Sequence, residues 1–243
     1  RIMRDFVGAK SSYETALNTN PSSQLRELIH SDIGKLYIYD GKYGEAKSYF
    51  RPEQNEKINI RTVEYVNSLL YGLEIDSAMT YLDEIILNVD TNHKYFNDLF
   101  ELHDLIANYY VDGTKDDKSA FKAFFNAESL INEYKIKEAV EVLEMIRLNY
   151  SDSLIYPIVT LRLAFISIDL MQYEKSIQYA LAIEETSLKD RGLTLAAEIE
   201  ENYLSNNENA LKYYHRVLSE CSSSLLADPV RLHVRRISKP RES

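Results

Sequence analysis

The sequence has little of what sharp turns, disulfides and membrane spans require. Its 243 residues include seven glycines and five prolines, and a fold of many short strands needs more turn residues than that. The single cysteine, Cys221, excludes an internal disulfide and a metal site made of several thiolates. No uninterrupted apolar run reaches the ~18 residues that suggest a membrane span. The nearest stretch, residues 153–171, contains Arg162 and Asp169. We therefore expect long helices joined by tight turns.

The net charge of −10 is unevenly spread along the chain. Residues 229–243 contain five Lys or Arg and one Glu, which gives +4, so the remainder carries −14. An acidic body repels the phosphates of nucleic acids. The composition therefore predicts that nucleic acid is not a partner.

Small residues recur at regular intervals inside apolar stretches. They are separated by 30, 32, 61, 37 and 34 residues, and the separation of 61 is close to two periods. The positions are Ala16, Ala46, Ala78, Ala139, Ser176 and Ala210. Periods of this size are typical of stacked helical repeats. We expect the small residue to lie where two antiparallel helices cross most closely, because a larger side chain there would push the backbones apart.

The segment "IGKLYIYDGKYGEAKSYF" (33–50) resembles the tetratricopeptide repeat, a helix–turn–helix unit of about 34 residues. The matching residues are Gly34, Tyr37, Gly41, Tyr43, Ala46 and Phe50. Ala127 and Ala164 replace the first glycine in two later copies, and Glu198 replaces it in the last copy, whose first helix is therefore out of register. The resemblance implies an all-α solenoid of antiparallel helix pairs, with about six repeats and a C-terminal capping helix.

Apolar periodicity predicts thirteen helices. They are expected near residues 9–18, 23–40, 42–50, 58–72, 75–88, 93–111, 117–132, 134–149, 156–171, 173–186, 190–204, 206–221 and 229–238. The helix at 93–111 has no partner in this scheme, which predicts altered packing between residues 91 and 118. The polar segment 111–119 is the expected hinge, and residues 50–59 form a second expected loop. The chain would then divide into N-terminal repeats (1–112) and C-terminal repeats with the capping helix (113–243), or form one continuous solenoid.

The last predicted helix has a start signal and two faces. Asp228 is expected to cap it, and Pro229 suits the first helical position, where its missing N–H is not needed. Its apolar face consists of Leu226, Val230, Val234 and Ile237, and its basic residues are Arg231, Arg235, Arg236 and Lys239. We expect the apolar face to seal the last repeat.

No pattern in the sequence indicates a catalytic site, a cofactor or a metal. Glu27 and His30 form one Glu-x-x-His unit, whereas a di-metal site in a helical bundle needs two. Cys221 lies on an apolar stripe, where a free cysteine usually behaves as a small hydrophobic residue. The adjacent acidic pairs Asp116–Asp117 and Glu200–Glu201 are interpreted as solvated charge. The interpretation is therefore a protein that is not an enzyme.

The resemblance implies a scaffold that holds a protein or peptide partner on a concave face lined by the first helix of each pair. Some members of the family clamp an acidic tail there with Lys and Asn. The matching positions are Ser31 and Lys35, Val63 and Asn67, Phe124 and Glu128, and Leu161 and Phe165, which provide no basic clamp. Val63, Phe124, Leu161 and Phe165 are thus the predicted partner-binding residues, and they indicate an apolar partner segment. Inter-helix core is the alternative role for these side chains.

Two settings for such a scaffold follow from the sequence. Residues 213–237 resemble the last unit of bacterial envelope repeat proteins, which favours a periplasmic adaptor in envelope assembly over a cytosolic adaptor. The alternative function is an accessory or regulatory domain of a larger enzyme or regulator, because the chain starts within a repeat-like pattern. The sequence leaves the identity of the partner and the oligomeric state open.

Overall fold

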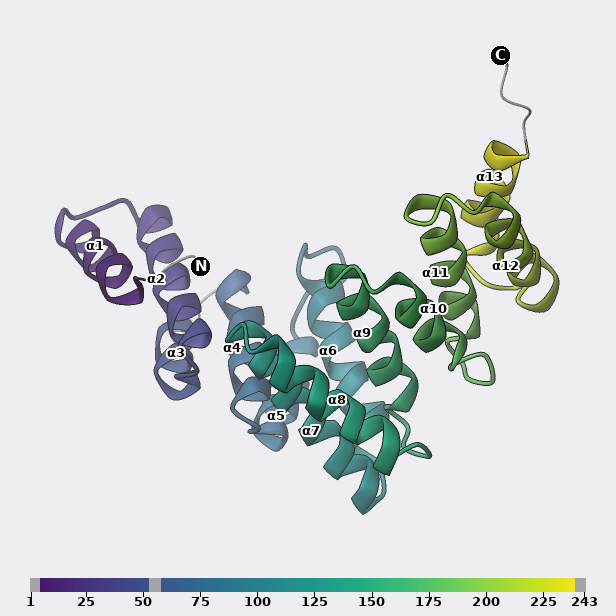
Figure 1. The fold of residues 1–243 in the computed structure, drawn as a ribbon. Helices are drawn as coiled ribbons and strands as arrows, with labels where there is room; N and C mark the ends of the chain where they lie inside the picture. Colours follow the sequence, from purple (N-terminus) through teal and green to yellow (C-terminus); the bar gives the residue numbers. More distant parts are fainter. Residues whose placement is uncertain (1–4, 53–57, 239–243) are drawn as a thin grey trace, which may run out of the picture. The chain divides into compact units, whose positions relative to one another are not determined.

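The computed structural model of the chain describes residues 5–52 and 58–238, and these residues form an all-α fold (Figure 1). The described residues form helices and turns, with no strand among them. The α-helices are α1 (Phe6–Asn18), α2 (Ser23–Tyr39), α3 (Tyr43–Phe50), α4 (Ile60–Tyr71), α5 (Ile75–Ile86), α6 (Phe96–Ile106), α7 (Lys115–Asn132), α8 (Ile136–Asn149), α9 (Tyr156–Asp169), α10 (Tyr173–Leu181), α11 (Lys189–Asn202), α12 (Asn207–Glu220) and α13 (Ala227–Ile237). A π-helical turn, η1 (Ala107–Val111), follows α6.

Each helix that the apolar periodicity predicts is present in the structure, which confirms the all-α, solenoid-like prediction. Three predicted bounds are wrong by three residues or more. The helix expected over 9–18 begins at Phe6, the helix expected over 93–111 begins at Phe96, and the helix expected over 173–186 ends at Leu181. The predicted end at 111 is confirmed, because η1 continues α6 to Val111. Part of the predicted loop at 50–59 and the predicted basic residue Lys239 lie outside the described residues.

The same left-handed turn joins the two helices of each pair. It connects α2 to α3, α4 to α5, α7 to α8, α9 to α10 and α11 to α12, and its central residue has a φ between 54° and 71°. These central residues are Gly41, Leu73, Tyr134, Met171 and Ser205. Each stands five positions before a small residue of the repeat pattern. Four of the five are not glycine, which is uncommon for this backbone conformation.

Five of the six recurring small residues are buried where helices pack together, as predicted. The sixth, Ala16 on α1, is only half-buried, so a close crossing there is not confirmed. Ala46, Ala78, Ala139, Ser176 and Ala210 are each 0% exposed. On α10, the Ser176 hydroxyl donates a hydrogen bond of 2.7 Å to the carbonyl oxygen of Ala164 on α9. Two helices that share such a contact cannot accommodate a large side chain between them, which explains the recurrence.

The last helix pair, α11–α12, is shifted by one residue, as Glu198 predicted. In the other four pairs the N–H after the left-handed residue reaches a carbonyl five positions back, as in Lys42 to Tyr37 at 2.8 Å. In the last pair the Asn206 N–H reaches Glu200, six positions back, at 2.7 Å. The extra residue moves Ala197 into the small position, where it is fully buried against Ala210.

A second recurring turn leads from one pair to the next. Two successive backbone hydrogen bonds, each spanning three residues, precede α6, α9, α11 and α13. The central residues of these turns are His93, Ser153, Thr186 and Ser224. Helix α6 is therefore entered like the first helix of a pair, but η1 and α7 follow it in place of a second helix. This explains the helix that had no partner in the sequence pattern.

The chain forms two compact units, residues 1–142 and 143–243. In the first unit α6 packs on α5, and α7 packs on η1 and on α4. The predicted hinge at 111–119 lies inside this unit, where Thr114 and Asp117 form a reciprocal capping box at the start of α7. The expected domain division after residue 112 stays a prediction.

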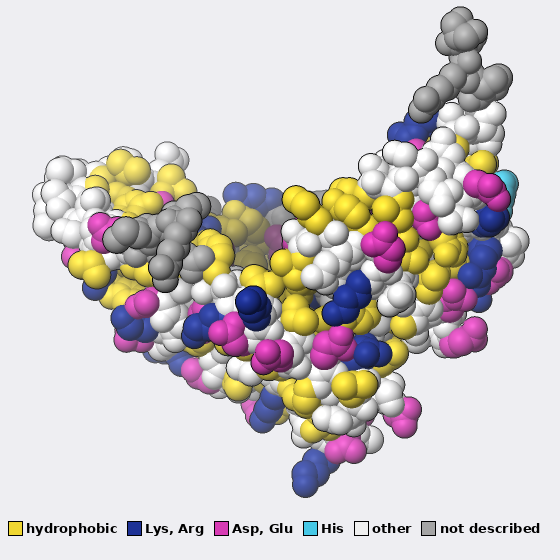
Figure 2. Space-filling model, in the orientation of Figure 1, with side chains coloured by type: hydrophobic (Ala, Val, Ile, Leu, Met, Phe, Trp, Pro, Cys, Tyr) yellow, Lys and Arg dark blue, Asp and Glu magenta, His cyan; other side chains and the backbone are white. Residues whose placement is uncertain are grey.

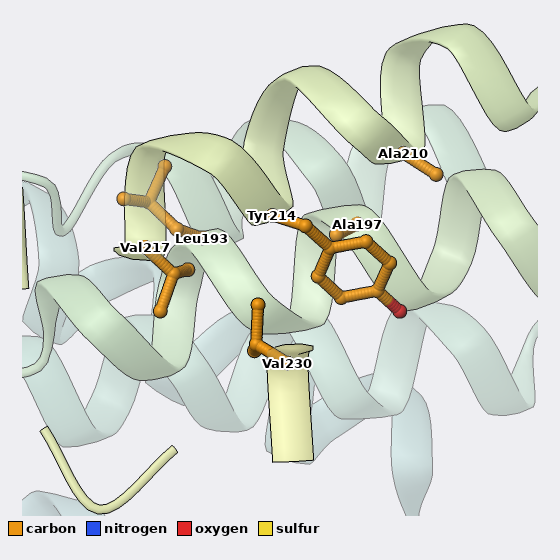
Figure 3. Close-up of a cluster of buried hydrophobic side chains, with 6 residues drawn as sticks. All are labelled: Leu193, Ala197, Ala210, Tyr214, Val217 and Val230. Carbon is orange, nitrogen blue, oxygen red and sulfur yellow. The ribbon is translucent and has the colours of Figure 1, made fainter. Parts of the chain in front are cut away.

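The second unit ends in α13, which packs its apolar face on α12. Val230 is 1% exposed and points into a cluster with Leu193, Tyr214 and Val217 (Figure 3). The predicted cap at Asp228 is wrong. The helix begins at Ala227, and the Asp228 carboxylate pairs with Arg231. Pro229 is tolerated as the third helical residue, because the first N–H groups of a helix have no acceptor within it.

Candidate partner-binding groove

An open groove of about 420 Å³ lies between α4 and α6 in the first unit. Val63 and Asn67 line it from α4, and Asp98, Glu101, Leu102 and Leu105 line it from α6. The lining residues follow helical spacing on each side, one turn on α4 and two turns on α6. Asp98 and Leu105 are seven residues apart, so at 1.5 Å per residue the α6 wall is roughly 10 Å long.

Helix α4 is fixed at both ends, which makes it a rigid wall of the groove. At its start the Asn59 side chain accepts from the Arg61 N–H at 2.8 Å, and the Arg61 guanidinium donates to the carbonyl oxygens of Tyr49 and Arg51, each at 3.1 Å. At its end the Ser129 hydroxyl of α7 donates to the Tyr71 carbonyl oxygen at 3.1 Å. The position of Val63 is therefore set from both ends of α4.

Helix α6 turns its other faces into the core and toward α5. Leu99 and Ile106 are 0% exposed. The His103 ring lies 3.0 Å from the Asp83 carboxylate of α5. These contacts occupy two faces of α6. Leu102 and Leu105 lie on a third face, where they are half-buried and line the groove.

The polar side chains of the groove have no partner among the described residues. Asn67 is half-buried, and its side-chain amide makes no hydrogen bond within that part of the chain. Asp98 and Glu101 are exposed and form no ion pair there. Other acidic residues nearby are paired: Glu64 lies 3.6 Å from Lys35, and Glu74 pairs with Lys47 at 2.5 Å. The groove thus combines an apolar floor with an amide and two carboxylates that have no partner among residues 5–52 and 58–238.

The structure places the four predicted binding residues in different surroundings. Val63, at 9% exposed, borders the groove. Phe124 is 7% exposed and packs edge-on against Phe125, with ring centroids 5.4 Å apart, so it contributes to the core. In the second unit Leu161 is half-buried and Phe165 is 45% exposed on α9. Their contact with a partner stays a prediction.

Sequence reasoning missed the α6 wall of the groove. The repeat pattern leaves the helix at 93–111 without a partner, and it matches none of the residues there to a binding position. The signal that identifies this wall is the turn around His93, which has the same hydrogen bonds as the turns before α9, α11 and α13. That turn marks α6 as a first helix, and first helices are the ones expected to line the binding face.

The interpretation of the acidic pairs as solvated charge is wrong for Asp117 in the first pair and for both residues of the pair Glu200–Glu201. Asp117 is 7% exposed and receives the Thr114 N–H at 2.9 Å, and Glu200 is 6% exposed. The side chain of Glu201 is 10% exposed and accepts from Tyr214 at 2.9 Å. Adjacent residues on a helix diverge by ~100°, which places Asp117 inward while Asp116 is exposed, whereas Glu200 and Glu201 are both largely buried.

Glu201 is the centre of a polar cluster under α13. His233 lies 3.0 Å from its carboxylate, and Arg236 pairs with it at 2.5 Å. Burial alone would raise the pKa of Glu201, but the hydrogen bonds from His233, Arg236 and Tyr214 lower it below its ordinary value. Burial raises the pKa of the neighbouring Glu198 carboxyl. This cluster fastens α13 to the pair α11–α12.

Cys221 ends α12 and packs against the same apolar cluster as Val230. Burial raises the pKa of its thiol, which disfavours the reactive thiolate form.

Among the described residues no group of three or more His, Cys, Asp or Glu side chains could hold a metal ion. Within the same residues, every helix is too short or too polar to cross a membrane.

Acidic and basic side chains are interspersed on the face shown in Figure 2.

Comparison with known proteins adds no family to these observations. No family model matches the chain, and no curated protein sequence matches it.

Proposed function

We propose that this chain is a protein-binding scaffold of the tetratricopeptide type rather than an enzyme, and that it holds a segment of its partner in the α4–α6 groove. The groove itself supports this proposal most directly. It is open, it has an apolar floor formed by Val63, Leu102 and Leu105, and both of its walls are first helices by their turns. First helices are the elements on which repeat proteins of this kind carry their binding surfaces.

The helix pairs support the family assignment within this proposal. Each pair has a left-handed residue five positions before a buried small residue. These small residues are separated by 32, 61, 37 and 34 residues, close to one or two lengths of a 34-residue unit. The resemblance of residues 213–237 to the last unit of envelope repeat proteins supports a role in bacterial envelope assembly.

A peptide-display selection tests the proposed function even though the partner is unidentified. Random twelve-residue peptides displayed on phage are selected on the intact protein and on a Leu102→Asn variant, with Leu28→Asn as the matched control. Leu28 is 58% exposed on α2, outside the groove. We expect peptides enriched on the intact protein to bind the Leu28→Asn variant equally and to lose binding to the Leu102→Asn variant. Enrichment that both variants retain, or no enrichment, would contradict a binding role for the groove.

A further inference from the structure

From the charge of its rim we infer that the α4–α6 groove accepts a basic segment of a partner protein, with an apolar side chain on the floor and Lys or Arg against Asp98 and Glu101. This inference rests on the proposed function and adds the chemistry of the ligand. It differs from the acidic-tail binding of some tetratricopeptide proteins, because the residues that line this groove include Asp98 and Glu101 and no Lys or Arg.

The floor requires an apolar anchor. Leu102 and Leu105 are half-buried and Val63 is 9% exposed, so a leucine-sized side chain placed there would remove apolar surface of both partners from water. Such burial contributes about 25 cal/mol per Å². The half-buried Asn67 amide beside it has both a donor and an acceptor to offer to a peptide backbone.

The rim selects positive charge. Asp98 and Glu101 stand one turn apart on the same edge of α6, and no basic residue of the described chain neutralises them. Residues three apart on a helix are neighbours, so the two carboxylates act together on one ligand region. A carboxylate-bearing segment would be repelled there, whereas Lys or Arg side chains would gain a partner on binding.

Two defined peptides test the charge preference. The probes are a fluorescein-labelled twelve-residue peptide of lysine and leucine and its counterpart with glutamate at every lysine position. Binding is measured by fluorescence anisotropy at physiological salt, where contacts between exposed charges more than ~8 Å apart are screened. The test variant is Asp98→Asn with Glu101→Gln. The control variant is Glu84→Gln with Asp116→Asn, which changes the net charge equally at exposed positions outside the groove.

We expect the lysine peptide to bind the intact protein, to bind the control variant within twofold, and to bind the test variant about fivefold to tenfold more weakly, as the loss of two partly exposed ion pairs requires. A third variant, Asp98→Lys with Glu101→Lys, should favour the glutamate peptide. Circular dichroism verifies that each variant keeps its helical content.

Three results would overturn the inference. Equal weakening by the test and control variants would mean that the peptide binds the net charge of the protein. Groove-dependent binding of the glutamate peptide, or selected phage peptides that are acidic, would leave the scaffold proposal intact and contradict the charge preference. Self-association that depends on Asp98 and Glu101 would identify the occupant as a second copy of this chain, whose α13 exposes Arg231, Leu232 and Arg235.

Discussion

A methyl group at Gly34 of α2 would place its carbon 2.4 Å from Cζ of Phe50 on α3. Phe50 is fully buried, so its ring cannot move away without disturbing the packing around it. Helices α2 and α3 therefore approach each other closely because position 34 has no side chain. Ala127, Ala164 and Ala197 stand at the corresponding position of three later pairs, and each is fully buried.

We predict that Gly34→Ala destabilises the protein by about 1–3 kcal/mol through overpacking. Gly44→Ala on α3 is the matched control, because a methyl group there would meet no atom within 4 Å. The control should be neutral or slightly stabilising, since alanine is the better helix former. Urea unfolding of both variants measures the difference. Equal midpoints would show that the α2–α3 crossing is not tight.

We predict that Met171→Gly stabilises the protein by about 0.5–1 kcal/mol, because glycine adopts the left-handed conformation without the clash of a Cβ atom. Met171 has a φ of 58° and is 76% exposed, so its side chain contributes little packing. Gly41→Ala at the equivalent turn, where φ is 71°, should destabilise by a similar amount. Opposite shifts in melting temperature would confirm the prediction. A loss of stability in Met171→Gly would contradict it.

We predict that Val230→Ser destabilises the second unit by about 2 kcal/mol, because it removes a buried side chain from the α11–α13 cluster. Leu232→Ser, two positions along the same helix, is the control. Leu232 is 65% exposed, so its substitution should change stability by no more than about 0.5 kcal/mol. Similar effects of the two substitutions would mean that α13 is not packed through the Val230 face.

The Glu201 cluster predicts a pH dependence of defined sign. The folded-state pKa of Glu201 lies below its ordinary value of 4.5, so its contribution to stability is present above pH 4.5 and is lost as pH falls through the folded-state pKa. Glu201→Gln should therefore lower the melting temperature at pH 7 and lower it less as the pH falls below 4.5. The pKa of Glu198 is raised by burial and also by the charge of Glu201, so Glu201→Gln lessens that shift and opposes a part of the loss at pH 7. A difference that stays constant between pH 7 and pH 3 would contradict the account.

The helices and the crossings could be predicted from the sequence because both depend on local patterns. Apolar periodicity marks each helix, and the small residues at 46, 78, 139, 176 and 210 mark where helices cross. The left-handed conformation of Leu73, Tyr134 and Met171 could not be predicted from residue type, because none of the three is a glycine. Only their fixed distance from the next small residue reveals them.

The groove was only half predictable. The repeat pattern singles out Val63, which borders the groove, whereas Leu102 and Leu105 belong to a helix that interrupts that pattern. A role of Val63 in partner binding stays a prediction. The pattern also assigns Phe124 to the same face as Val63, yet Phe124 packs against Phe125 and does not border the groove. Near the interruption the register of α7 depends on its contacts with η1 and α4, and these contacts are tertiary.

Hydrogen–deuterium exchange with a groove-dependent phage-selected peptide locates the binding site on the intact protein and tests the central claim most directly. We predict that the peptide slows amide exchange in α4 (Ile60–Tyr71) and α6 (Phe96–Ile106), and that this protection is lost in the Leu102→Asn variant. Protection confined to other helices, such as α9 with Leu161 and Phe165, would place the binding face elsewhere and contradict the α4–α6 groove.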